Sequence, residues 1–299
     1  MTDKPRFRLD HWMQDRFLRG MIWLLLRLPY AWRVPLCGWF TAHVIAPVAG
    51  YRARVRENLA LVMPDLPPSE VRRMEIAVPD NVGRSLIEIY SGADFVARAS
   101  AEPLQGPGVA TLEQAHRENR PVLLITGHFG NYDAVRGGLI ARGYPVGGLY
   151  KPMKNRWFND HYVRAISRIG TPLFARGKRG LAEMVKFLRG GGMVGMVIDQ
   201  HMGQGARLTF MGVDAMTALS AAEMALKYDA LLIPTYAVRR PDGLGFDILV
   251  EQPIPRTDAV TMTQALNDSL EALVRRHPEQ WFWIHRRWKA KPLPDEEED

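Results

Sequence analysis

The sequence predicts an α/β fold with a largely parallel central sheet flanked by helices, preceded by an N-terminal amphipathic and apolar helical segment for membrane attachment. From Pro121 onward, short apolar runs bounded by Gly and Pro alternate with amphipathic stretches of helical length, as in βαβ units. Residues 1–58 differ in composition, because they hold ten Lys and Arg against four Asp and Glu. With 299 residues and 47% hydrophobic content, the chain can bury a large core.

The N-terminal segment, residues 1–58, interleaves basic residues with runs rich in Trp, Leu and Tyr, "FLRGMIWLLLRLPYAW" and "VPLCGWFTAHVIAPVAGY". This mixture is typical of a segment that lies in a membrane interface. A transmembrane span and an ordinary buried helical hairpin are the alternatives; Arg27, Pro29 and Arg33 interrupt the first run. The charged start, without a small-residue cleavage site, predicts no cleavable signal peptide. No nucleic-acid-binding signature accompanies the basic charge, so nucleic acid is not an expected partner.

The rest of the chain is predicted element by element. After a Pro-rich break at 63–70, residues 71–92 show helical periodicity. Apolar runs then predict strands at 122–126, 146–151, 172–175, 193–199, 230–240 and 246–254. Helices are predicted from residue 133 and at 157–170, 180–190, 218–228 and 265–276. We expect one catalytic domain at 59–290, a disordered acidic tail at 291–299, and a buried packing role for the single cysteine, Cys37.

The stretch "LLITGHFGNYDAV" could be a metal site, a proton-transfer pair or a plain loop. His128 follows a strand at its carboxyl end, where open α/β sheets place ligands. Gly127 and Gly130 allow a tight turn, and Asn131 can cap a helix whose first turn holds Asp133. That carboxylate could fix the tautomer of His128, so that the other ring nitrogen takes a proton from substrate.

Several chemistries are excluded by missing motifs. The sequence contains no G-x-S-x-G elbow, no H-E-x-x-H and no plausible catalytic cysteine. A histidine base without a protein nucleophile remains, and no metal or cofactor is expected. A metal-dependent hydrolase using His128, Asp133 and Asp199, and a non-catalytic lipid-binding protein, are the alternatives from other classes.

The string "TGHFGNYD" resembles the His-x4-Asp/Glu motif of the late lipid A acyltransferases, the lauroyl and myristoyl transferases of the bacterial inner membrane, within the lysophospholipid acyltransferase superfamily. The resemblance extends over most of the chain. Its further stretches are "RVRENLALVMPDL" (54–66), "ARGKRGLAEMVKFLRGG" (175–191), "VIDQHMGQGARLTFMG" (197–212) and "HPEQWFWIHRRWK" (277–289). Many members have Glu at the position of Asp133 and an aromatic pair at Phe210 and Met211.

The resemblance implies acyl transfer from an acyl carrier protein thioester to a hydroxyl of a lipid acceptor at the cytoplasmic face of the inner membrane. It implies that His128 is the base, that Asp133 is its partner, and that Arg176 and Asp199 are further polar residues of the site. The acceptor is a lipid A precursor or, alternatively, a lyso-aminolipid or lysophospholipid. Because the carrier protein is acidic and the precursor carries phosphates, the following basic residues are candidate binding residues: Arg164, Arg168, Arg176, Lys178 and Arg179.

Overall fold

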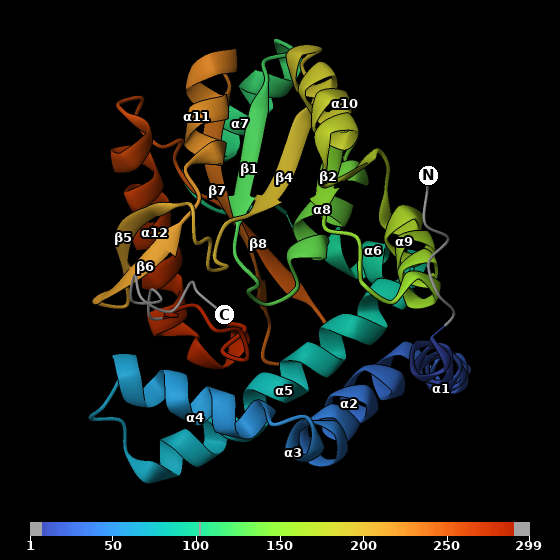
Figure 1. The fold of residues 1–299 in the computed structure, drawn as a ribbon. Coiled ribbons are helices and arrows are strands. Elements are labelled where there is room, and N and C mark those ends of the chain that lie inside the picture. The colour runs from blue at the N-terminus through green and yellow to red at the C-terminus, as the bar shows by residue number, and fades with distance from the viewer. Residues whose placement is uncertain (1–7, 102, 290–299) are drawn as a thin grey trace.

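The computed structural model describes residues 8–101 and 103–289. The acidic tail predicted at 291–299 and the first residues of the N-terminal segment lie outside the described residues. The centre of the fold is a six-stranded sheet in the order β3-β2-β4-β1-β7-β8 (Figure 1). The strands are β1 (Val122–Thr126), β2 (Val146–Tyr150), β3 (Leu173–Ala175), β4 (Met193–Val197), β7 (Leu231–Arg239) and β8 (Phe246–Val250). The first five strands in this order are parallel and β8 is antiparallel to β7, so the predicted largely parallel sheet is confirmed.

Helices cover both faces of the sheet because its strands are apolar on both sides; all five residues of β1 are buried. One face carries α6 (Ala93–Ala99), α7 (Val109–Arg117), α8 (Tyr132–Ile140) and α9 (Arg156–Ile169). The other carries α10 (Lys178–Arg189), α11 (Ser220–Tyr228) and α12 (Ala259–Arg276). Adjacent residues of β1 therefore enter different cores: Leu124 packs with the first group and Leu123 with the second.

The N-terminal segment folds as a set of helices beside the sheet. These are α1 (Leu9–Leu25), α2 (Tyr30–Phe40), the π-helix η1 (Thr41–Ile45), α3 (Ala46–Val48), α4 (Tyr51–Val62) and α5 (Pro68–Tyr90). Figure 1 shows α5 running below the sheet, with α2 and α3 on its far side. Helix α5 approaches α2 closely because Gly83 has no side chain: a Cβ there would lie 2.5 Å from the carbonyl oxygen of Cys37. Cys37 is buried in this contact, as predicted, and burial raises the pKa of its thiol to about 12.

The N-terminal helices carry many exposed apolar side chains. Trp23, Trp32 and Trp39 are 56%, 68% and 53% exposed. Further exposed apolar residues between α1 and α4 are Leu9, Met13, Phe17, Leu24, Leu36, Val44, Val48 and Leu61. We call this set the apolar N-terminal surface. Across residues 8–101 and 103–289, no helix combines the length and hydropathy that crossing a bilayer requires.

The sequence analysis missed a hairpin made by β5 (Ala206–Phe210) and β6 (Val213–Thr217). Met211 and Gly212 form its two-residue turn, both with positive φ, 57° and 76°. Such a turn favours Gly, Asn or Asp at both positions, so the methionine concealed it. The side chain of Phe210 lies under the Trp288 ring, and a short 3-10 helix, η2 (Pro278–Gln280), leads into this aromatic core.

Candidate active site

The loop 127–131 joins β1 to α8 and carries the candidate base, His128. Gly130 has φ of 53°, and a Cβ on it would lie 1.9 Å from the carbonyl oxygen of Ala237, so a side chain there would displace β7. Asn131 is the N-cap of α8: its side-chain oxygen accepts a hydrogen bond from the backbone N–H of Asp133, at 3.2 Å. The predicted cap is confirmed, and the loop is the sharp turn that the glycines indicated.

His128 is held by Asp199, which follows β4 on the neighbouring strand of the sheet. The ring nitrogen Nδ1 lies 2.7 Å from Asp199 Oδ1, and the backbone N–H of His128 donates to Oδ2, also at 2.7 Å. The indole N–H of Trp281 donates to Oδ2 at 2.8 Å. Because the Asp199 carboxylate accepts a hydrogen bond from Nδ1–H, the other nitrogen, Nε2, is left as the proton acceptor. The imidazole is 21% exposed, which leaves it accessible.

This geometry corrects the predicted partner of His128. The sequence analysis assigned Asp133 to the ring and treated Asp199 as a further polar residue of the site. In the structure Asp199 occupies the orienting position, while the side chain of Arg176 is exposed and lies 4.0 Å from the sulfur of Met202. The spacing within the His-x4-Asp string concealed this, because Asp199 is 71 residues away from His128 in the sequence.

The charges of His128 and Asp199 stabilise each other. Burial by itself would lower the pKa of His128, but the charge of Asp199 and its hydrogen bond raise that pKa above its ordinary value. Burial would likewise raise the pKa of Asp199, but the charge of His128, with the hydrogen bonds from His128 and Trp281, lowers it. The carboxylate therefore stays ionised and favours the imidazolium form of the base.

Asp133 is paired with Arg136, three residues later on α8. Arg136 Nε donates to Asp133 Oδ1 at 2.8 Å, and the terminal nitrogen Nη2 lies 2.7 Å from the same oxygen. The remaining donors of Arg136 reach the carbonyl oxygens of Gly170, at 2.7 Å, and Ile166, at 3.0 Å. Asp133 therefore fixes an arginine that ties α8 to the end of α9. The sequence analysis missed Arg136, although its i+3 spacing from Asp133 was a usable signal.

His128, Asp133 and Arg136 line one cavity of about 350 Å³ between the sheet and helices α8 and α9. Most of its other lining is apolar or aromatic: Leu149, Tyr150, Met153, Tyr162, Ile166, Leu173, Met196 and Val197. Burial raises the pKa of Tyr132, a further lining residue, to about 12, so its hydroxyl stays neutral. We call this the site cavity. It lies at the carboxyl end of the parallel strands, where α/β folds place their ligands.

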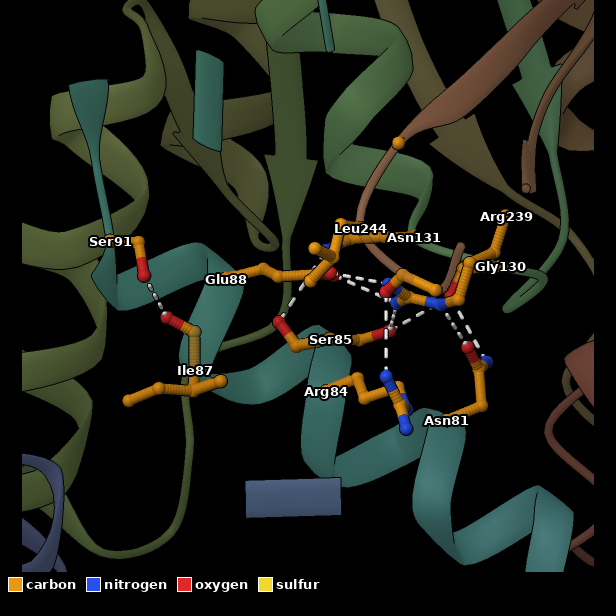
Figure 2. A network of polar contacts seen from close by, with 12 residues as sticks. Asn81, Arg84, Ser85, Ile87, Glu88, Ser91, Gly130, Asn131, Arg239 and Leu244 are labelled. Atoms are coloured by element: carbon orange, nitrogen blue, oxygen red, sulfur yellow. Dashed lines mark hydrogen bonds and ion pairs between the residues drawn. The ribbon is translucent and has the colours of Figure 1, made fainter. Parts of the chain in front are cut away.

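On the opposite side of the loop, a buried polar network holds its backbone (Figure 2). Glu88 of α5 is fully buried and pairs with Arg239 at the end of β7, with one N–O distance of 2.8 Å. The same carboxylate accepts a hydrogen bond from the Asn131 amide at 2.9 Å. Ser85 and Asn81, also on α5, donate to the carbonyl oxygen of Gly130 at 2.9 and 3.2 Å. Residues of α5 therefore fix the loop that carries His128.

The C-terminal segment completes this support. Gln280 accepts the backbone N–H of Gly130 on its carbonyl at 2.9 Å, and the backbone N–H of Phe282 donates to the carbonyl of His128 at 3.0 Å. Trp281 and Trp283 are about as buried as any residue, 1% and 0% exposed, so these tryptophans are core residues.

The predicted basic residues do not all lie together. Arg176, Lys178 and Arg179 line a second cavity of about 370 Å³ that shares Tyr150 and Leu173 with the site cavity. Arg164 and Arg168 are exposed on α9 and line neither cavity. For the metal-dependent alternative, no set of three or more His, Cys, Asp or Glu within residues 8–101 and 103–289 is arranged to hold an ion.

Fold and site define a class first: an α/β protein in which a histidine held by a carboxylate opens onto a largely apolar cavity at the edge of a parallel sheet. The family follows from comparison. Residues 2–290 match the bacterial lipid A biosynthesis acyltransferase family, so the chain belongs to that family and is an acyltransferase. The resemblance seen in the sequence is confirmed.

Individual relatives agree with this assignment. The chain is 26% identical to the lipid A biosynthesis lauroyltransferase of Escherichia coli (strain K12), over 98% of both chains. It is 23% identical to the lipid A biosynthesis palmitoleoyltransferase of the same organism, over 92% of this chain and 90% of that protein. A lipid A biosynthesis acyltransferase of Haemophilus influenzae is 23% identical over 93% and 94% of the two chains.

Proposed function

We propose that this protein transfers a fatty acyl chain from the thioester of acyl carrier protein to a hydroxyl of a lipid A precursor, at the cytoplasmic face of the bacterial inner membrane. The observation that carries the proposal is the His128–Asp199 pair at the mouth of a largely apolar cavity. Membership of the lipid A acyltransferase family supports the acceptor class. A largely apolar cavity beside a base suits a substrate that combines an alkyl chain with a reacting polar group.

The mechanism follows from the position of the base. Nε2 of His128 takes the proton of the acceptor hydroxyl as its oxygen attacks the thioester carbonyl carbon. The bond from carbon to sulfur then breaks, and the imidazolium returns the proton to the departing thiolate, which leaves as the free thiol. Asp199 stabilises the imidazolium that forms between these two steps. No acyl group is attached to the protein at any point.

Asp133 acts on the site cavity in this proposal. Its pairing with Arg136 connects α8 to the carbonyl groups of Ile166 and Gly170 at the end of α9. Helices α8 and α9 form the wall of the cavity opposite the sheet. Asp133 thus contributes to catalysis by fixing the space in which the acyl chain lies, and its charge is fully used by the arginine.

The donor approaches from the edge of the sheet. The second cavity, lined by Arg176, Lys178 and Arg179, adjoins the site cavity through Tyr150 and Leu173. Acyl carrier proteins are acidic and deliver the thioester on a phosphate-bearing arm. Cations beside the opening suit both the acidic surface and that phosphate. Arg164 and Arg168, outside both cavities, are two further exposed cations for the acidic partner.

The acceptor approaches from the membrane. The exposed tryptophans and aliphatic residues of the apolar N-terminal surface suit insertion into one leaflet, while Arg16 and Arg27 lie over Trp12 and Trp23, 5.5 and 4.5 Å from the ring centres. Helix α1 also contacts the chain beside the cavity: Asn155 donates to the carbonyl of His11 at 2.8 Å. The lipid surface and the cavity entrance are therefore neighbours.

The decisive test is acyl transfer by purified protein with acyl carrier protein as donor and a lipid A precursor as acceptor. His128→Ala should reduce turnover by about 10²- to 10⁴-fold, the usual contribution of a general base. Donor binding should remain, because most of the residues that line the cavity are unchanged. Omitting the acceptor should give no stoichiometric acyl-protein. Near-normal turnover of the variant, or transfer to lyso-aminolipid in place of the lipid A precursor, contradicts the proposal.

Membrane attachment is tested on vesicles of anionic phospholipid. Replacing Trp32 and Trp39 together by Ser should weaken partitioning about tenfold or more, because each exposed indole loses its burial in the interface. Leu181→Ser is the matched control, since Leu181 is 45% exposed on α10, away from the apolar N-terminal surface. Equal partitioning of both variants and the unaltered protein would disprove attachment through this surface.

A further inference from the structure

The floor of the site cavity contains two glycines at matching positions on neighbouring strands. Gly195 of β4 is in register with Gly148 of β2, and both line the cavity. The same row continues to Leu124 of β1 on one side and Leu173 of β3 on the other. Strand interiors disfavour glycine because it has no side chain to pack. Two of them side by side leave a trough in the sheet where the cavity lies against α8 and α9.

Crowding does not explain the glycine at position 195. A Cβ built there would meet nothing closer than the carbonyl oxygen of Gly147, at 3.7 Å, which is an ordinary contact. At Gly148 a Cβ would lie 3.3 Å from Arg136 Cδ and 3.4 Å from Leu173 Cδ2, both side-chain atoms. The backbone can therefore accept a side chain at residue 195, and that side chain would occupy cavity space.

The trough ends one row further from His128. Residues of one strand face project to the same side every second position, so the next row on this face is Val122, Met193 and Val146. These three side chains are at most 1% exposed and close the sheet surface. Successive rows are about 7 Å apart. The glycine row thus lies between the reacting end of the cavity, at Thr126 and Val197, and this row of buried side chains.

We propose that Gly195 and Gly148 determine the length of the acyl chain that the protein accepts. The methylene groups at the far end of the chain lie against these two glycines, in front of Met193. The inference rests on the proposed function, because it requires an acyl donor in the site cavity. It adds the residues that select among donors. A pocket distinguishes apolar chains of different length by the space that it leaves for the last methylene groups. A wall at the end of this space excludes longer chains.

The test is a competition among acyl carrier proteins that carry saturated chains of even length. Gly195→Val should lower kcat/KM for the chain that the unaltered protein prefers by about tenfold or more, while a chain two carbons shorter is retained or becomes preferred. Gly195→Ala should shift the preference the same way by less. Should the valine variant not fold, the alanine variant, whose Cβ meets only an ordinary contact, gives the same comparison.

Two further variants separate chain selection from loss of activity. Ile125→Val alters the buried core on the opposite face of β1 and should leave the preferred chain length unchanged. Met193→Val removes volume in the row of buried side chains beyond the glycines and should raise acceptance of longer chains, a gain that structural damage would not produce. A uniform loss across all chain lengths in the Gly195 variants overturns this inference and leaves the proposed function standing. Absence of acyl transfer by the unaltered protein defeats the proposed function itself.

Discussion

The loop that carries His128 separates two regions of opposite character. Toward α5 and β7, Glu88, Arg239, Asn131 and Gln280 bond to one another and to the loop backbone in a buried network. Toward α8 and α9, the sheet offers glycines and apolar side chains around an open cavity. A base must keep one orientation, whereas a flexible chain has to enter and leave. The comparison shows that one side of the turn holds the base rigidly, while the other side provides space for the acyl chain.

Removing the charge of Glu88 tests the rigid side and should have the larger effect. Glu88→Gln leaves the Arg239 guanidinium buried without its counter-charge, which should lower the free energy of unfolding by about 3–5 kcal/mol, measured by urea denaturation. The matched control is Glu183→Gln, because Glu183 pairs with an Arg179 side chain that is 93% exposed, so no measurable change is expected. Equal changes in the free energy of unfolding of the two variants would mean that this buried network stabilises the fold no more than a surface ion pair does.

The pH dependence of kcat/KM tests which carboxylate belongs to the base. His128 must be neutral to accept a proton. Burial lowers its pKa, but Asp199 raises that pKa by more. Activity should therefore fall as the pH drops through a value above the pKa of a free histidine. Asp199→Asn removes the charge that raises the pKa, so this acid limb should move to lower pH and the plateau should fall. Asp133→Asn should lower activity without moving the limb, since Asp133 pairs with Arg136. A limb that moves in the Asp133 variant and stays in the Asp199 variant would restore the pairing first expected from the sequence.

Local patterns in the sequence were sufficient for much of the fold. Strand composition and helical periodicity predicted the six strands of the sheet, and glycine spacing predicted the turn and the Asn131 cap. Each of these features depends on residues within a few positions of one another. The histidine itself was found in the same way, because a strand end between glycines is a local signal.

Contacts between distant segments could not be predicted by the same reasoning. Asp199 approaches His128 because β4 lies next to β1, and that strand order is a property of the whole sheet. Glu88 and Arg239 are 151 residues apart, and neither has a local partner that would indicate the other. The Asp133–Arg136 pair is different, since it is local; the His-x4-Asp spacing drew attention to the wrong neighbour.

The contact between the C-terminal segment and the loop has a consequence for the order of folding. Trp281 donates to Asp199, and Phe282 donates to the carbonyl of His128. These residues leave the ribosome after every other part of the site, and Asn58, near the start of the fold, bonds to the carbonyl of Trp283 across 225 positions. Closing such long loops is entropically costly and slow. The orientation of the base depends on these contacts, so a nascent chain completes the site only after translation has passed residue 282.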